Sequence, residues 1–156
     1  MGWQTSGEEA SMSTEQNKAL VRSWLEAVDS GDVSVVEKFL DPDYVDHNPP
    51  PFPGMPPGLE GARRAFVHGL DAFSGFHHEI EEQYADGETV ITRLVGYGKH
   101  TGDFLGIPPT GKDVRMEGIA IHRIVERKLV EHWAQIDAVG LLVQLGAIPP
   151  PGTAAP

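Results

Sequence analysis

Hydrophobic residues recur at helical spacing near the start of the chain. From Leu20 to Val28 they occupy every third or fourth position, and the pattern stops at Gly31. Ser13 and Thr14 precede the pattern, and both residue types cap helix N-termini. The spacing therefore predicts a helix that begins at Ser13 or Thr14 and ends before the glycine.

Two further helices are predicted, and a proline-rich loop separates them. Asp32 can cap a short helix, which Asp41-Pro42 ends because the residue before a proline disfavours helical backbone angles. Six prolines within residues 49–57 then predict an extended loop. Helical spacing returns over residues 60–73 and predicts the third helix.

The second half of the chain alternates hydrophobic and polar residues, which is the period of a β-strand. Residues 78–85 and 88–100 flank Asp86-Gly87, a strong signal for a tight hairpin turn. Two strands are therefore predicted here, paired antiparallel to each other.

A second strand pair is predicted at residues 114–125 and 128–137, joined across Glu126-Arg127. A two-residue hairpin turn requires positive φ angles, which neither residue favours. The alternation predicts the strands, whereas the turn between them is chemically unusual.

The ends of the chain are expected to frame a single domain, residues 13–146. A short helix is predicted to follow Asp137 and to end at Gly146. Residues 1–12, rich in Gly, Ser and Glu, are expected to be a disordered extension, and residues 147–156 a disordered Pro/Ala tail. Helices followed by antiparallel strands predict an α+β fold, in which the helices pack on one face of a curved sheet that encloses a pocket.

Composition argues against several function classes. The chain has 12 Lys+Arg and 23 Asp+Glu, and its formal net charge of −11 repels nucleic acid and anionic membranes. It has no cysteine, no stretch approaching the ~20 apolar residues that span a bilayer, and no signal-peptide pattern in residues 1–11. We therefore expect a soluble, cytoplasmic protein that binds neither nucleic acid nor membranes.

Four groups of residues carry a resemblance to one protein family. They are Tyr44-Val45-Asp46-His47, residues 98–112 (GKHTGDFLGIPPTGK), Glu131-His132-Trp133 with Asp137, and Gln144-Leu145-Gly146. In these motifs and their order the chain resembles the SnoaL-like polyketide cyclases, or ester cyclases, of the nuclear-transport-factor-two-like superfamily. The resemblance covers about residues 18–146, and departs from the common Asp-Gly hairpin tip at Glu126-Arg127.

The resemblance implies a cone-shaped α+β barrel, dimerisation through the sheet, and a small hydrophobic or polyketide-like substrate. True cyclases of the family close a polyketide ester by an intramolecular aldol reaction without metal or cofactor. The general acid/base there is an aspartate on the last strand, which corresponds to Asp137. The wider family also contains isomerases, hydrolases, hydroxylases and proteins with no known activity. A non-catalytic ligand-binding protein and an epoxide or lactone hydrolase therefore stay open.

Asp137 is the first candidate for the chemistry. Aldol closure needs a base that removes a proton next to a carbonyl, and donors that hold the resulting enolate. One buried carboxylate with imidazoles around it supplies both. The alternative is that Asp137 only caps the helix that follows it.

Three histidines on the predicted strands could orient a substrate or share its proton. His122 ranks above His100 because it lies in the middle of its strand. Strict alternation puts Trp133 and Gln135 on the same face as the candidate aspartate and His132 on the other face. Trp133 and Gln135 are therefore predicted to line the pocket, and His132 is not.

Two further polar residues could contribute. Arg93 lies in an otherwise apolar strand, so it should meet a carboxylate or a substrate oxygen, unless it lies on the solvent face of the sheet. Asp46 and His47 enter the proline-rich loop, where a pocket mouth is expected. His47 could be a second acid/base group, or it could have only a turn role.

Apolar residues from several elements are predicted to complete the pocket, although such residues are more often plain core: Trp24, Phe66, Tyr97, Phe104 and Met116. No metal-ligand spacing or dinucleotide-binding motif occurs in the sequence, so no metal or cofactor is expected. Ile119 and Ile121 alternate onto the face opposite Met116, and this apolar outer face predicts a homodimer.

Overall fold

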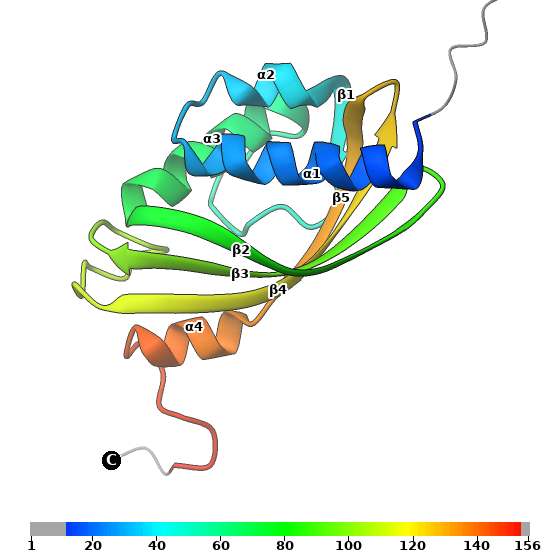
Figure 1. The fold of residues 1–156 in the computed structure, drawn as a ribbon. Helices are drawn as coiled ribbons and strands as arrows, with labels where there is room; N and C mark the ends of the chain where they lie inside the picture. Colours follow the sequence, from blue (N-terminus) through cyan, green and yellow to red (C-terminus); the bar gives the residue numbers. More distant parts are fainter. Residues whose placement is uncertain (1–11, 154–156) are drawn as a thin grey trace, which may run out of the picture.

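The computed structural model describes residues 12–153, which form one curved sheet with helices on it (Figure 1). The elements of this part of the chain are α1 (Thr14–Asp29), α2 (Val35–Phe39), β1 (Leu40–Asp46), α3 (Gly58–Ala72), β2 (Phe73–Asp86), β3 (Thr89–His100), β4 (Asp113–Val125), β5 (Lys128–Ile136) and α4 (Ala138–Gln144). The strand order is β1-β5-β4-β3-β2, and α1, α2 and α3 lie together over one face of the sheet. The predicted α+β class is confirmed.

Helix α1 begins where its capping residues predict. The Ser13 side chain accepts a hydrogen bond from the Gln16 backbone N–H, and the Gln16 side chain accepts one from the Ser13 N–H. This capping box satisfies two backbone donors that the first turn of a helix leaves free. The hydrophobic stripe is buried at Val21 and Leu25, so the helix packs its apolar face onto the sheet.

Strand β1 was not predicted, because Asp41-Pro42 reads as a helix end followed by a loop. The segment instead pairs in parallel with β5, with Leu40 opposite Leu129 and Asp46 opposite His132. A proline is tolerated here because β1 is an edge strand of the sheet. The pairing places the end of β1 next to β5, the strand on which the last predicted site residues lie.

The two hairpin turns differ in chemistry. Asp86 pairs with Thr89, so the first turn is Gly87-Glu88, one residue later than predicted, and Gly87 has a φ of 55°. In the second turn Glu126 and Arg127 have φ angles of 47° and 63°, as a tight hairpin requires. The strand pairing therefore imposes a conformation that these two side chains disfavour.

Helix α4 follows β5 directly and continues along the edge of β4. The Asp137 N–H donates to the Glu117 carbonyl at 2.9 Å, and the Gln144 amide exchanges hydrogen bonds with the Arg115 backbone. Figure 1 shows α4 on the opposite side of the sheet from α1, α2 and α3. The predicted final helix is confirmed, and it lies away from the face that the first three helices cover.

Met12, the last residue of the predicted extension, packs against the core cluster that includes Val21 and Leu25. Of the predicted extension, residues 1–11 lie outside the described residues, and residues 147–153 of the predicted tail contain no helix or strand. Within residues 12–153 we find no helix with the length and apolar character needed to cross a membrane.

Candidate functional site

A largely apolar cavity of about 340 Å³ lies between the helices and the face of the sheet that they cover. Trp24 on α1 and Phe66 on α3, two of the residues predicted to line a pocket, lie on its wall. Five polar side chains also reach the wall: Tyr44, Asp46, His78, His122 and His132. An apolar cavity with a few convergent polar groups is the usual form of a small-molecule site.

His132 and Asp46 form a pair on the cavity wall. They are opposite each other in the parallel β1–β5 pairing, and His132 Nδ1 lies 3.2 Å from Asp46 Oδ1. An ionised carboxylate only accepts hydrogen bonds, so Nδ1–H donates to it and Nε2 keeps its lone pair. The pair thus holds an imidazole in the tautomer that can take up a proton.

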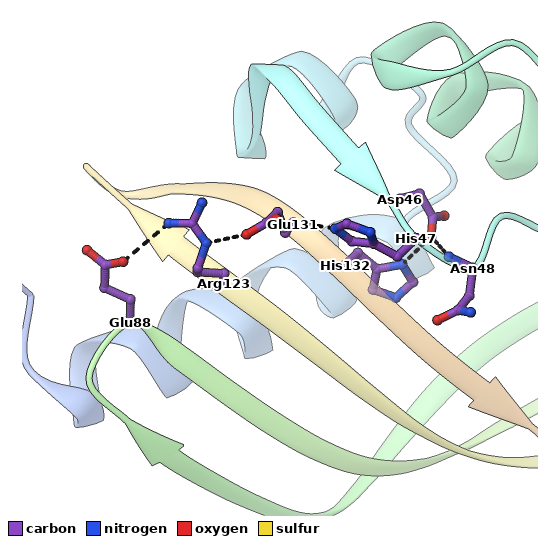
Figure 2. A network of polar contacts seen from close by, with 7 residues as sticks. All are labelled: Asp46, His47, Asn48, Glu88, Arg123, Glu131 and His132. Atoms are coloured by element: carbon purple, nitrogen blue, oxygen red, sulfur yellow. Dashed lines mark hydrogen bonds and ion pairs between the residues drawn. The ribbon is translucent and has the colours of Figure 1, made fainter.

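The surroundings of Asp46 keep it ionised. Burial alone would raise the pKa of this carboxyl, but hydrogen bonds from His132 and the Asn48 backbone, with the nearby His132 and His47 side chains, hold the pKa below its usual value. Figure 2 shows Asp46 between His132 and Asn48. Asp46 is therefore the charged member of the pair.

His122 lies beside His132 and is almost fully buried, with 3% of its surface exposed. The two residues pair across β4 and β5, and their ring centroids are 4.9 Å apart. Burial, and then the positive charge that His132 can carry, lower the pKa of His122 to about 3. His122 is therefore a neutral imidazole, and its buried Nδ1 has no hydrogen-bond partner within residues 12–153.

Tyr44, on β1, adds a phenol to the same wall. Burial raises the pKa of Tyr44, and the charge of Asp46 raises it further. Its hydroxyl therefore keeps its proton and can donate a hydrogen bond to a ligand oxygen.

His47 lies outside the cavity, although it follows Asp46 directly. Its Nε2 is 3.2 Å from Glu131 Oε1, and its ring stacks on Trp133 with centroids 4.3 Å apart. Glu131 also pairs with Arg123, which in turn contacts Glu88 (Figure 2). The Arg123 guanidinium, and then His47, lower the pKa of Glu131. The predicted place of His47 at the pocket mouth is therefore wrong.

The assignment of faces on β5 is also wrong. His132, Ala134 and Ile136 line the cavity, whereas Trp133 and Gln135 do not. Alternation along the strand is regular, as predicted, but the inward-facing residues are the even-numbered ones.

Asp137 does not lie buried in the cone. It is exposed and caps α4, where its Oδ1 accepts the Gly140 N–H at 2.8 Å. It is absent from the cavity wall, because β5 ends at Ile136 and the chain turns there into the helix beside β4. Asp137 therefore has the geometry of a helix cap, which was the alternative to a catalytic role.

Arg93 and His100 also lie away from the cavity. Arg93 is on the exposed side of β3 and pairs with Glu81 and Glu82, so it meets carboxylates rather than a substrate oxygen. His100 is fully buried, and its Nδ1 accepts the Thr110 N–H at 3.2 Å. Its role is to hold the loop between β3 and β4.

Three predicted lining residues belong to other parts of the molecule. Phe104 and Met116 pack against the core cluster beneath α4. Tyr97 stacks on His77 with centroids 5.5 Å apart and lines a separate groove on the other side of the sheet. Within residues 12–153, no three His, Asp or Glu side chains are grouped as metal ligands.

Tyr44, His78 and His132 were not predicted as cavity residues, and Asp46 was predicted only to lie at the pocket mouth, without a chemical role. One signal could have found His132: it lies directly opposite His122 across the β4–β5 hairpin, so both must face the same way. Asp46 could not be placed without the parallel pairing of β1.

Comparisons with known proteins agree on one family. The family model described as SnoaL-like polyketide cyclase matches residues 18–145. The chain is 34% identical over 133 residues to the aklanonic acid methyl ester cyclase DnrD of Streptomyces peucetius, across 81% of this chain and 88% of that protein. It is 31% identical over 125 residues to the nogalonic acid methyl ester cyclase of Streptomyces nogalater, across 77% and 90% of the two chains. The solved structure of TsrD from Streptomyces laurentii matches with a TM-score of 0.78 at 26% identity, across 88% of this chain and 99% of that one.

Proposed function

The chain belongs to the SnoaL-like polyketide cyclase family, and we propose that it closes a ring in a polyketide ester by an intramolecular aldol reaction. The observation that carries the proposal is the His132 imidazole, oriented by Asp46 on the wall of an apolar cavity. Two relatives are named as cyclases of polyketide methyl esters, which supports a substrate of that class.

His132 is the general base in this proposal. Its Nε2 removes a proton from the carbon next to a carbonyl, and Asp46 stabilises the imidazolium that forms. The resulting enolate carbon attacks a ketone of the same molecule, so that one C–C bond forms and the ketone oxygen becomes an alkoxide. Proton uptake by the alkoxide completes the reaction, and the product is an isomer of the substrate.

In this proposal Tyr44 and His122 stabilise the enolate oxygen. Both are neutral hydrogen-bonding groups on the cavity wall, because burial raises the pKa of Tyr44 and lowers the pKa of His122. Donors fixed in a water-poor site stabilise developing negative charge without having to reorganise. The acid/base role that the family resemblance assigns to Asp137 passes to the His132–Asp46 pair in this proposal.

The test compares two histidine variants. His132→Gln should lower kcat for aklanonic or nogalonic acid methyl ester by ~10²–10⁴-fold, because it removes a general base. The matched control is His47→Gln, since His47 also pairs with a carboxylate at 3.2 Å but lies outside the cavity. Chromatography follows the product, which has the mass of the substrate and a different retention time, and a thermal melt checks that each variant folds.

Two outcomes would contradict the proposal. One is a His132→Gln variant that folds and turns over at the parental rate. The other is a parent protein that binds these esters without converting them, which would favour the non-catalytic binding alternative.

We also propose that the chain forms a homodimer through the sheet face opposite the cavity. Ile119 and Ile91 on this side of the sheet are 49% and 39% exposed in the single chain. Exposed apolar side chains of this kind support a contact in which a second copy covers them. Light scattering at micromolar concentration should give about twice the mass of the chain, and a monomer would refute the proposal.

A further inference from the structure

The cavity wall carries a second imidazole–carboxylate pair that the proposed mechanism does not use. His78 on β2 lines the cavity, and its Nδ1 lies 2.6 Å from Oδ1 of Asp29, the last residue of α1. We propose that His78 is a second catalytic residue, which donates a proton to the ketone oxygen as the ring closes, and that Asp29 positions it. This inference rests on the proposed function.

Asp29 fixes the ring of His78 more firmly than one hydrogen bond would. Its second oxygen, Oδ2, accepts the backbone N–H of His78 at 2.9 Å, so one carboxylate holds both the main chain and the side chain. The ring of Phe76 meets the imidazole edge-on, with centroids 5.0 Å apart. With Nδ1 engaged by Asp29, Nε2 is the ring nitrogen that remains for a ligand in the cavity.

Both partners are partly shielded from solvent, with side-chain exposures of 16% for His78 and 20% for Asp29. The His132–Asp46 pair has nearly the same values, 20% and 21%. A surface ion pair would be worth little and would not need a cavity-facing imidazole. The likeness of the two pairs in geometry and exposure supports a proton-transfer role for His78 as well as for His132.

The imidazoles of the two pairs lie on the same face of the sheet, on strands that are not neighbours. His132 lies on β5 and His78 on β2, with β4 and β3 between them. At a strand spacing of about 4.8 Å the two strands are roughly 14 Å apart along the sheet. The sheet is curved around the cavity, so both imidazoles face a substrate bound there from different strands.

An aldol closure uses proton transfers at two sites of the substrate. His132 Nε2 takes the proton from carbon, and the enolate carbon forms the new bond to the ketone carbon. The electron pair of the C=O bond moves to oxygen, which takes a proton from Nε2–H of the His78 imidazolium while Nδ1–H stays bonded to Asp29. His132 then loses its extra proton to solvent, and His78 takes up a proton from solvent. Both histidines return to their starting protonation states, and the product has the same atoms as the substrate.

The experiment compares His78→Ala with His77→Ala. His77 is the neighbouring histidine of β2, and it stacks on Tyr97 on the other side of the sheet. His78→Ala should lower kcat by ~10²-fold or more with a smaller change in KM, and added imidazole should restore part of the rate. His77→Ala should keep the parental kcat and show no response to imidazole.

Two further variants keep the inference testable if His78→Ala folds poorly. His78→Asn retains an N–H donor for Asp29, so it should fold but lose kcat as His78→Ala does. Asp29→Asn should lower kcat less than either, because the imidazole stays in the cavity while the charge that orients it and stabilises its protonated form is removed.

The outcomes separate this inference from the proposed function. If His132→Gln is inactive and His78→Asn turns over at the parental rate, the role of His78 is refuted and the proposed function stands. Loss of rate in His78→Ala without any rescue by imidazole, together with a parental rate in His78→Asn, would assign the pair a structural role only. A parent protein that closes neither ester overturns both proposals.

Discussion

Two imidazole–carboxylate pairs built from neighbouring residues lie on opposite sides of the same strands. Asp46 and His132 form the inner pair, His47 and Glu131 form the outer pair, and the closest N–O distance is 3.2 Å in both. One step along β1 and one along β5 reverses the direction of the side chains, which is enough to move a pair from the cavity to the exterior.

The surroundings of the two pairs differ more than their geometry. The outer carboxylate, Glu131, is also bound by Arg123, and the outer imidazole is covered by the Trp133 ring. The inner imidazole instead lies beside the neutral ring of His122, in an apolar cavity. The outer pair fastens β1 to β5, whereas the inner pair leaves a ring nitrogen available to a ligand. An imidazole and a carboxylate thus stabilise the fold on one side and carry the proposed acid/base chemistry on the other.

A large loss of kcat/KM is expected when a bulky side chain fills the cavity. Ala134 lines the cavity, so Ala134→Trp should occupy the space of the substrate and lower kcat/KM by about 10²-fold or more. Gln135→Trp adds the same ring to an exposed neighbour on the other face and should leave kcat/KM within about twofold. Steady-state kinetics on both variants, with thermal melts to check folding, measures the difference. Equal losses of kcat/KM in the two variants would contradict the assignment of Ala134 to the cavity side of β5 and of Gln135 to its outer side.

A smaller effect is expected in the pH dependence of stability. The pKa of His122 is lowered to about 3 in the folded protein and is about 6.5 in the unfolded chain. As the pH falls below 6.5 the unfolded chain takes up this proton first, so the stability that His122 contributes is complete above pH 6.5 and is lost toward pH 3. Between pH 7 and pH 5 the loss should be about 2 kcal/mol.

His122→Leu removes this titration and should reduce the loss of unfolding free energy between pH 7 and pH 5 by about that amount. Urea denaturation at the two pH values gives the comparison. An unchanged pH dependence in His122→Leu would show that its ring is not held neutral by burial.

Much of the fold could be predicted from local patterns. The Ser13 cap, the stripe that ends before Gly31 and the alternation after residue 77 each depend on neighbours in the sequence, and the structure confirms the helix and strands they predict. Helix α4 also begins as its cap, Asp137, predicts. Such signals lie within one or two turns of backbone, so a single sequence contains them.

The site depended on contacts that a single sequence does not reveal. Alternation on β5 separates His132 from Trp133 but does not say which of them faces inward, because both faces carry polar and aromatic residues. Asp46 reaches His132 through a parallel pairing between segments 86 residues apart in the chain. Asp137 was preferred because it matches a family motif, and its position depends on β5 ending one residue earlier.

The most direct test compares the two aspartates, Asp46 and Asp137. Asp46→Asn keeps the size of the side chain but removes the charge that orients His132 and stabilises its protonated form, so turnover should fall by ~10²–10⁴-fold. Asp137→Asn should turn over within about twofold of the parent and melt at nearly the same temperature, because asparagine caps helices about as well as aspartate. The measurement is kcat for both variants on a polyketide methyl ester that the parent converts. The opposite result, with turnover lost in a folded Asp137→Asn and kept in Asp46→Asn, would place the chemistry at the end of β5 and contradict the role of the inner pair.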